Sequence, residues 1–457
     1  MSSVFGGGGD MMGPGDKGLK FSLADTFRMA WADPDLRQRI IFVLSVFALF
    51  AFCIHVPVPM PGVPAADIEE AVKSNGFLAM LGMMGGRALQ RVSILALGLG
   101  PYITASIIMQ ILNAANPAWK KELQEGGEFA RRAQGKRTRY LTLALCAAQG
   151  WGLIKTLQGA IPSMNAAVVA NPWLPYTTIL FWTAGAMLML WLGEQLTERG
   201  IGNGVSLIIF AGIVISFPST VQQVWDSIQN GTTAWYAGII VLVMFFFSTW
   251  FITYFTIAQR RIPVQHIRRQ FGTKSMGGAT SYLPFSVVMV GVIPIIFAIA
   301  LIQIPYQFMG WFPVGSQGHT ILQNVAAFLN PNFSDWRGFV GVFIYAGLIF
   351  FFSYFYTAVQ FNVEDIANNL KRAGSFIPGI RPGKQTKDFL DGVISRITVV
   401  GAFFLAAVAL SPYLLPLFIN VVNVQLLFGT SLLIMVSVAL ETMRQIEANI
   451  LMKQYGQ

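Results

Sequence analysis

Long runs of apolar residues, separated by polar and charged segments, dominate the pattern of the chain. Ten of these runs approach the length of about 20 residues that a helix needs to cross the hydrocarbon core of a bilayer. A shorter apolar piece precedes the second run, and the fifth run is short. The pattern therefore predicts ten membrane spans, at residues 40–56, 94–115, 140–158, 178–196, 201–217, 235–257, 285–304, 339–359, 393–411 and 425–446.

Positively charged residues lie mostly on one side of these spans. Of the 31 Lys and Arg residues, 26 fall in the N-terminal arm, in the loops after spans two, four, six and eight, or at the C-terminal end. Cytoplasmic loops of membrane proteins carry such an excess, so we expect the basic side to face the cytoplasm. Ten is an even number, and both termini are then cytoplasmic. The opposite side keeps Lys73, Arg87, Arg91, Lys155 and Arg337.

The composition also indicates a polytopic membrane protein. Of the 457 residues, 54% are hydrophobic and 11% are charged, whereas soluble domains have roughly 25% charged residues. The start, MSSVFGGGGDMMGPGDKG, lacks the apolar core of a signal peptide, and we expect a disordered arm there. Cys53 and Cys146 lie within apolar spans and the three histidines are scattered, so we expect neither a disulfide nor a metal site.

The spans contain almost no charge. Lys155, Glu194 and Glu441 lie toward span ends, whereas ion-coupled transporters place ionisable groups near the membrane centre. An intramembrane hydrolase would need a nucleophile with a base or a metal, and no such pair or nucleotide motif is evident. A small-molecule carrier and a membrane enzyme are thus disfavoured alternatives. The polar residues within the spans are neutral: Ser106, Gln110, Ser206, Gln303, Thr430 and Ser431.

Glycine and proline interrupt three of the predicted spans, as in LGLGPYITASIIMQ (97–110), GIGNGVSLIIF and VIPIIF. Leu99 and Ile103, and likewise Val205 and Ile209, are four residues apart and share a helix face. A ring of such side chains would exclude ions and water by dewetting. Ordinary packing of helices through small residues is the alternative interpretation. Spans one to five and six to ten also form two odd-numbered sets, which predicts inverted halves with a pathway between them.

Five motifs, in order along the chain, resemble the SecY family, the pore subunits of the bacterial protein-translocation channel. They are GLGPYITASIIMQIL, GIGNGVSLIIFAGIV, GVIPIIFA, FIPGIRPGKQT and FGTSLLIMV. The resemblance implies an all-α membrane protein whose ten helices, in two inverted five-helix halves, form an hourglass channel for polypeptide. The implied regions are an N-terminal arm (1–39), a first half (40–217), a second half (218–446) with cytoplasmic loops near 258–284 and 360–392, and a cytoplasmic tail (447–457).

The resemblance also assigns residues to the closed channel. A pore ring falls on Leu99, Ile103, Val205, Ile209, Ile296 and Ile434. A plug falls near residues 76–86 and includes Phe77, Leu78, Met80, Leu81, Met83 and Met84. A lateral gate, which releases apolar segments sideways into lipid, is implied between spans two and three and spans seven and eight. Its polar candidates are Ser106, Gln110 and Gln303, and packing hydrogen bonds are the alternative role for these residues.

We expect the chain to be no enzyme and to need no cofactor, so the energy for transport must come from partners. The resemblance implies that these partners dock on the basic loops. Those partners are the SecA motor ATPase and translating ribosomes, beside SecE-like and SecG-like membrane subunits. Signal sequences and unfolded polypeptide are the implied cargo, and anionic lipids would also attract the loops. The implied location is the bacterial inner membrane. The docking residues would be Arg260, Arg261, Arg268, Arg269 and Arg381.

Overall fold

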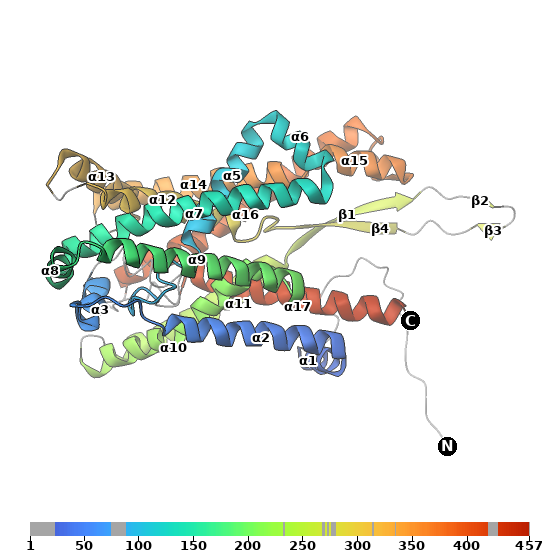
Figure 1. Cartoon of the computed structure of the whole chain (residues 1–457). Coiled ribbons are helices and arrows are strands. Elements are labelled where there is room, and N and C mark those ends of the chain that lie inside the picture. Colours follow the sequence, from blue (N-terminus) through green and yellow to red (C-terminus); the bar gives the residue numbers. More distant parts are fainter. Residues whose placement is uncertain are drawn as a thin grey trace, which may run out of the picture.

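The chain folds into a bundle of long helices with a β-hairpin projecting from one end (Figure 1). The computed structural model describes residues 23–74, 88–231, 234–266, 270–271, 274–275, 280–312, 315–333, 335–418 and 428–456. Within these residues the molecule is mostly helical, as the sequence predicts.

The helices before residue 230 correspond to the first five predicted spans. Shorter helices cap the bundle between the long ones. The bounds are α1 Leu23–Ala32, α2 Pro34–Ile54, α3 Ala65–Ser74, α5 Gly100–Ala115, α6 Pro117–Glu125, α7 Gly127–Ala160, α8 Pro162–Ala170, α9 Leu174–Arg199 and α10 Gly204–Gln229.

The remaining helices correspond to the other five predicted spans and their connections. Their bounds are α11 Trp235–Ile257, α12 Ile293–Met309, α13 Gln317–Leu329, α14 Trp336–Gln360, α15 Val363–Arg372, α16 Lys384–Phe418 and α17 Thr430–Gly456. Every predicted span therefore overlaps a helix. Six helical segments of the described residues are long and apolar enough to cross a membrane: Pro34–Ile54, Leu174–Arg199, Gly204–Gln229, Trp235–Ile257, Trp336–Arg372 and Lys384–Leu414.

The helices of the second and seventh predicted spans begin six and eight residues later than the hydrophobic pattern indicates. Residues 88–99 form turns rather than the start of a span, and α5 begins at Gly100. In the same way α12 begins at Ile293, eight residues after the predicted boundary. The physical reason is proline, because Pro101 and Pro294 both stand in the first turn of their helices. A proline there loses no intrahelical hydrogen bond, whereas in a helix interior it would.

The loop near residues 258–284 carries a small sheet that the helical prediction did not include. Strands β1 (Gln259–His266) and β4 (Thr280–Ser286) pair antiparallel, with Ile262 opposite Leu283. Strand β5 (Ser375–Phe376), from the loop after α15, pairs with the other edge of β1. The short strands β2 (Gln270–Phe271) and β3 (Lys274–Ser275) form a separate pair.

This sheet belongs to a folded unit that joins two loops distant in sequence. Ile262, Val264 and Phe285 of the sheet pack with residues of α15, α16 and the segment after β5 in one apolar core. Ile262 and Val264 are buried, while Arg261 and Pro263, which alternate with them along the strand, are exposed. This alternation is expected of a strand with one covered face. We call β1, β4, β5, α15 and residues 377–394 the sheet unit.

The two ends of the bundle differ. The hairpin, α1, α6, α15 and the end of α17 lie at one end, whereas α3, α8 and α13 lie at the other (Figure 1). The first end carries the basic loops of the sequence, so we call it the basic end. Lys453 of α17 also pairs there with Asp33, the N-cap of α2, at 2.8 Å and with Asp35 in the first turn of α2 at 2.7 Å. This contact joins the described N-terminal and C-terminal parts of the chain.

Candidate functional site

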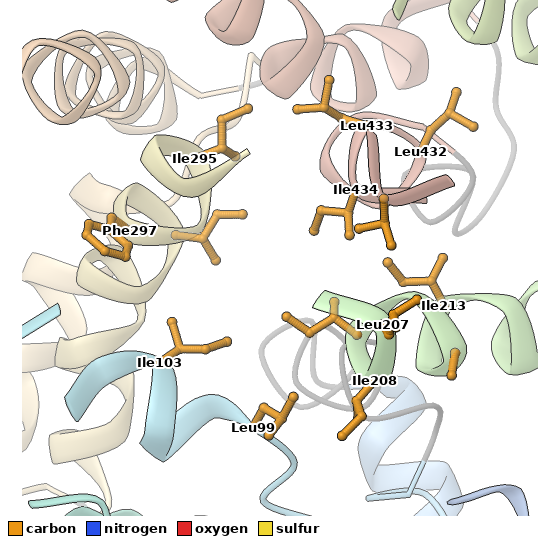
Figure 2. Close-up of a cluster of buried hydrophobic side chains, with 14 of the residues drawn as sticks. Leu99, Ile103, Leu207, Ile208, Ile213, Ile295, Phe297, Leu432, Leu433 and Ile434 are labelled. Atoms are coloured by element: carbon orange, nitrogen blue, oxygen red, sulfur yellow. The ribbon is translucent and has the colours of Figure 1, made fainter. Parts of the chain in front are cut away.

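The six residues of the predicted ring come together in the largest apolar cluster of the molecule. Leu99, Ile103, Ile209 and Ile434 are buried members of this cluster, and the partly buried Val205 and Ile296 pack against it. Figure 2 shows Leu99 and Ile103 facing Ile434, with side chains of α10 and α12 beside them. Residues more than 300 positions apart in the sequence are thereby assembled at one place. We call this set of six the ring residues.

The ring residues share a local position: Leu99 caps α5, and the other five lie within the first two turns of their helices. Leu99 is the N-cap of α5 and its carbonyl accepts a hydrogen bond from the Ile103 N–H at 3.0 Å. Val205 stands in the first turn of α10, where the Asn203 side chain accepts its N–H at 3.1 Å. Ile296 and Ile434 are the fourth and fifth residues of α12 and α17. The helix breakers of the sequence thus mark four helix starts that converge on the ring.

The apolar cluster around the ring residues, which we call the ring cluster, consists of hydrophobic residues, of which Cys53 carries a thiol and Tyr345 a hydroxyl. All of its members are hydrophobic, including the neighbours Leu207, Ile208 and Leu433. Among the described residues there is also no group of His, Cys, Asp and Glu side chains that could hold a metal ion. The six ring residues offer van der Waals contact and exclude water, but none of them carries a group for acid–base or nucleophilic chemistry.

The carboxylate near the end of span four is neutralised. Arg139 of α7 donates from Nε and from an Nη to the two carboxylate oxygens of Glu194 on α9, at 2.8 and 2.7 Å. This is the bidentate geometry that arginine and carboxylates favour. The sequence flagged Glu194 but did not identify its partner, which lies 55 residues away.

The three polar gate candidates fall in two places. Gln110 donates to the Ser106 hydroxyl at 3.0 Å on the same helix, and its side chain lies near Tyr356 of α14. Gln303 is buried on α12, and its Nε2 has no hydrogen-bond partner among the described residues. The structure therefore brings Ser106 and Gln110 together but places Gln303 in a different environment.

Gln303 lines a cavity of about 50 Å³ between α5, α7 and α12. Thr104, Gln149, Gly152 and Gln307 line the same cavity. A site with several polar groups and this volume has room for water. Neither Gln149 nor Gln307 was among the predicted site residues. Gln307 could have been predicted, because it lies four residues after Gln303 and therefore on the same helix face.

The predicted docking residues lie at the basic end where they are described. Arg260 and Arg261 are exposed on β1, and Arg381 is exposed in the turn that follows β5. Gly383, with φ of 107°, closes this turn, a conformation that glycine adopts readily. Thr386 stabilises the turn by donating to the Arg381 carbonyl at 2.9 Å. Arg268 and Arg269 lie outside the described residues, as do the predicted plug residues Phe77, Leu78, Met80, Leu81, Met83 and Met84.

An ion pair fastens two helices of the sheet unit. Lys387 of α16 donates to a carboxylate oxygen of Glu364 on α15 at 2.8 Å. This hydrogen bond lowers the pKa of the Glu364 carboxyl and raises the pKa of the Lys387 ammonium, because each charge favours the other. Both side chains are accessible to solvent, so screening by salt weakens the pair.

Comparison with known proteins identifies the family. The sequence profile of SecY matches residues 93–443, more than half of the chain. The protein translocase subunit SecY of Aquifex aeolicus (strain VF5) is 36% identical over 426 residues, which cover 92% of this chain and 96% of the relative. The protein translocase subunit SecY of Escherichia coli (strain K12) is 38% identical over 426 residues, covering 92% and 93%.

Solved structures share the fold. A structure described as "The structure of a protein conducting channel" matches with a TM-score of 0.67 at 20% identity, covering 92% of this chain and 94% of that one. A study of the plug domain of the SecY protein gives the same TM-score at 19% identity and the same coverage. Sec61 from a canine ribosome–channel complex matches at 0.60 and 17% identity, again covering 92% and 94%. The chain therefore belongs to the SecY family of protein-conducting channel subunits, which are transport proteins and not enzymes.

Proposed function

We propose that this chain is the pore subunit of a Sec translocon in a bacterial inner membrane, where it passes unfolded secretory polypeptides. The observation that carries the proposal is the convergence of four helix starts on one uncharged apolar cluster. Aliphatic side chains hold no fixed hydrogen-bond pattern, so they can contact polypeptides of any sequence. In the resting channel the ring residues and a plug near residues 76–86 form the seal.

The proposed channel consists of two inverted halves around this ring. Residues 40–217 form the first half and residues 218–446 the second, with an arm at 1–39 and a tail at 447–457. Ring residues come from both proposed halves, since α5 and α10 precede residue 230 and α12 and α17 follow it. When the two halves move apart, the constriction between them opens and a polypeptide can pass.

The proposed lateral gate separates α5 and α7 from α12 and α14. Gln110 of α5 lies near Tyr356 of α14 across this boundary, and residues of α5, α7 and α12 line the cavity at Gln303. In lipid, helices associate through close packing and hydrogen bonds rather than through the hydrophobic effect. An apolar segment in the pore can replace such contacts and leave sideways into the bilayer.

We place partner docking at the basic end, which we propose to be cytoplasmic. Arg260, Arg261 and Arg381 present cations on the sheet unit, and the loop arginines Arg268 and Arg269 add to them. Such a surface suits ribosomal RNA phosphates, acidic surfaces of a SecA motor ATPase and anionic lipids. Sec61 occurs in a ribosome–channel complex, which supports the ribosomal assignment. SecE-like and SecG-like subunits complete the proposed assembly.

Depletion of the chain in cells tests this function. We expect the export of a secretory reporter with a cleavable signal to stop as the chain is lost, and the unprocessed precursor to accumulate. The uptake of small solutes should be unchanged over the same period. Continued export at full rate after complete depletion would contradict the proposal and would favour a small-molecule carrier.

A further inference from the structure

Helices α7 and α12 touch through their backbones at the end of the bundle away from the basic end. Gly152 of α7 and Gly310, which follows α12, supply this contact. A Cβ added to Gly152 would collide with the Gln307 carbonyl oxygen, and a Cβ added to Gly310 would collide with the Gly152 carbonyl oxygen. Figure 1 shows the two helices side by side in this region. We call the contact the glycine seam.

A hydrogen bond between the same two segments reinforces the glycine seam. The Trp311 indole Nε1 donates to the Ala148 carbonyl oxygen at 3.2 Å, one turn of α7 before Gly152. A methyl group at Gly152 would also lie 3.3 Å from the same indole nitrogen. The close approach and the hydrogen bond therefore depend on each other.

The packing beside the glycine seam is much looser. The cavity of about 50 Å³ between α5, α7 and α12 begins at Gly152 and extends to Gln303. The Gln303 Nε2 has no hydrogen-bond partner there among the described residues. Along this boundary, close backbone contact occurs at the glycine seam, while the neighbouring part is incompletely filled.

We propose that the glycine seam is the outer closure of the lateral gate and sets how apolar a segment must be to leave through it; this inference rests on the proposed function. A passenger can shift a closed–open equilibrium only by its greater affinity for the open state. A stronger closed contact therefore demands a more apolar passenger. Close backbone approach through small residues is a main source of helix association in lipid, so the two glycines determine this threshold.

The variants Gly152→Ala and Gly310→Ala test the inference, with Gly150→Ala as the matched control. Gly150 lies on the same helix, but an added Cβ would make only ordinary contact with Ile179 of α9, at 3.5 Å. The assay is the export of one reporter whose signal has a shortened apolar core. We expect roughly fivefold more export from each seam variant, because weakening the closed contact by about 1 kcal/mol changes the closed–open equilibrium about fivefold. The control should show no change.

Trp311→Phe keeps an aromatic ring but removes the N–H donor, and it should raise export of the weak signal by less than the glycine variants. Export of the unaltered reporter must depend on the chain in every strain; if it does not, the proposed function itself fails. If it does, and both glycine variants match Gly150→Ala at equal protein levels, only the inference about the seam is overturned.

A cysteine pair gives a second test, in which the reduced and oxidised forms of one variant are compared, so that any effect of the Gly310 substitution itself is present in both forms. A Cβ at position 310 would lie 2.9 Å from the Thr156 hydroxyl oxygen, so Thr156→Cys with Gly310→Cys places two thiols within reach of a disulfide. We expect oxidation to stop the release of an apolar segment into lipid and a reductant to restore it. Undiminished lateral release with the disulfide fully formed would show that this contact does not open, and the inference would fail.

Discussion

The ring cluster and the sheet unit both bury aliphatic side chains, yet they differ in what surrounds those side chains. In the ring cluster the six ring residues are aliphatic and lie at the starts of four helices spread across the chain. In the sheet unit the apolar face is covered, and the opposite face presents Arg261 while Arg381 stands at the edge. Contacts without directional bonds are replaceable by any passing chain, whereas fixed charges select a partner. We therefore assign conduction of the polypeptide to the ring cluster and docking of partners to the sheet unit.

The largest expected effect comes from placing a charge in the ring cluster. Ile103→Lys buries an ammonium without a partner, which costs several kcal/mol unless water enters. We expect ion leak through vesicles that contain the chain to rise at least about tenfold, which corresponds to about 1.4 kcal/mol in the closed state. Ile103→Val keeps the apolar character and is the control. An unchanged leak with equal amounts of inserted Ile103→Lys protein would contradict the sealing role.

A charge reversal on the docking surface should have the next largest effect. Arg381→Glu places like charge opposite an acidic partner, which costs several kcal/mol at an interface, so we expect motor-driven export to fall roughly tenfold or more. Insertion of the channel itself and its resting ion leak should stay normal. Arg337→Glu, a charge reversal at the start of α14, is the matched control. Normal export by Arg381→Glu at normal expression would remove Arg381 from the docking surface.

Loss of packing inside the sheet unit should be a local change. Leu390 is completely buried in the core of this unit, and Leu390→Ala is expected to cost about 2–5 kcal/mol of local stability. Hydrogen exchange of the β1, β4 and β5 amides should accelerate, while ion leak through the ring should not change. Phe389→Ala, at the adjacent and exposed position, serves as the control. Leak that rises together with exchange would show that the two regions do not behave independently.

The smallest effect is expected from the Lys387–Glu364 pair. The folded-state pKa of Glu364 is lowered from its ordinary 4.5, so the contribution of the pair is present above that pH and is lost as pH falls through the lowered value. The pKa of Lys387 is raised from 10.5, so the contribution is also lost at higher alkaline pH. We expect slightly faster exchange of the α15 amides in Lys387→Gln at neutral pH. No difference from wild type at low salt would show that the pair contributes nothing.

Much of the fold follows from the hydrophobic pattern, because membrane spans are defined by length and apolarity alone. Each of the ten predicted spans overlaps a helix, yet Pro101 and Pro294 start helices that the pattern begins earlier. Hydropathy does not distinguish an apolar turn from an apolar helix. The rule that proline occupies the first turn of a helix would have placed both boundaries.

The site was accessible from the sequence in part. Motif order, with four-residue spacing for two of the pairs, pointed to six residues that the structure gathers into one cluster, and their role as a pore ring stays a prediction. The partner of Glu194 and the pairing of β1 with β5 were not accessible, because each joins segments far apart in the chain. The backbone contact of Gly152 with Gly310 depends on how two helices approach each other, and local sequence does not determine that approach.

Site-specific photocrosslinking from Ile103 and Ile209 is the most direct test of the central claim that polypeptide passes through the ring cluster. A secretory chain stalled partway across the membrane provides the target. The same probe at Phe246 of α11, whose side chain is exposed on the outside of the helix, provides the control. We predict crosslinks from both ring positions that appear with the stalled chain and vanish on its release, and none from Phe246. Continued export without any crosslink from Ile103 or Ile209 would contradict the assignment of the ring.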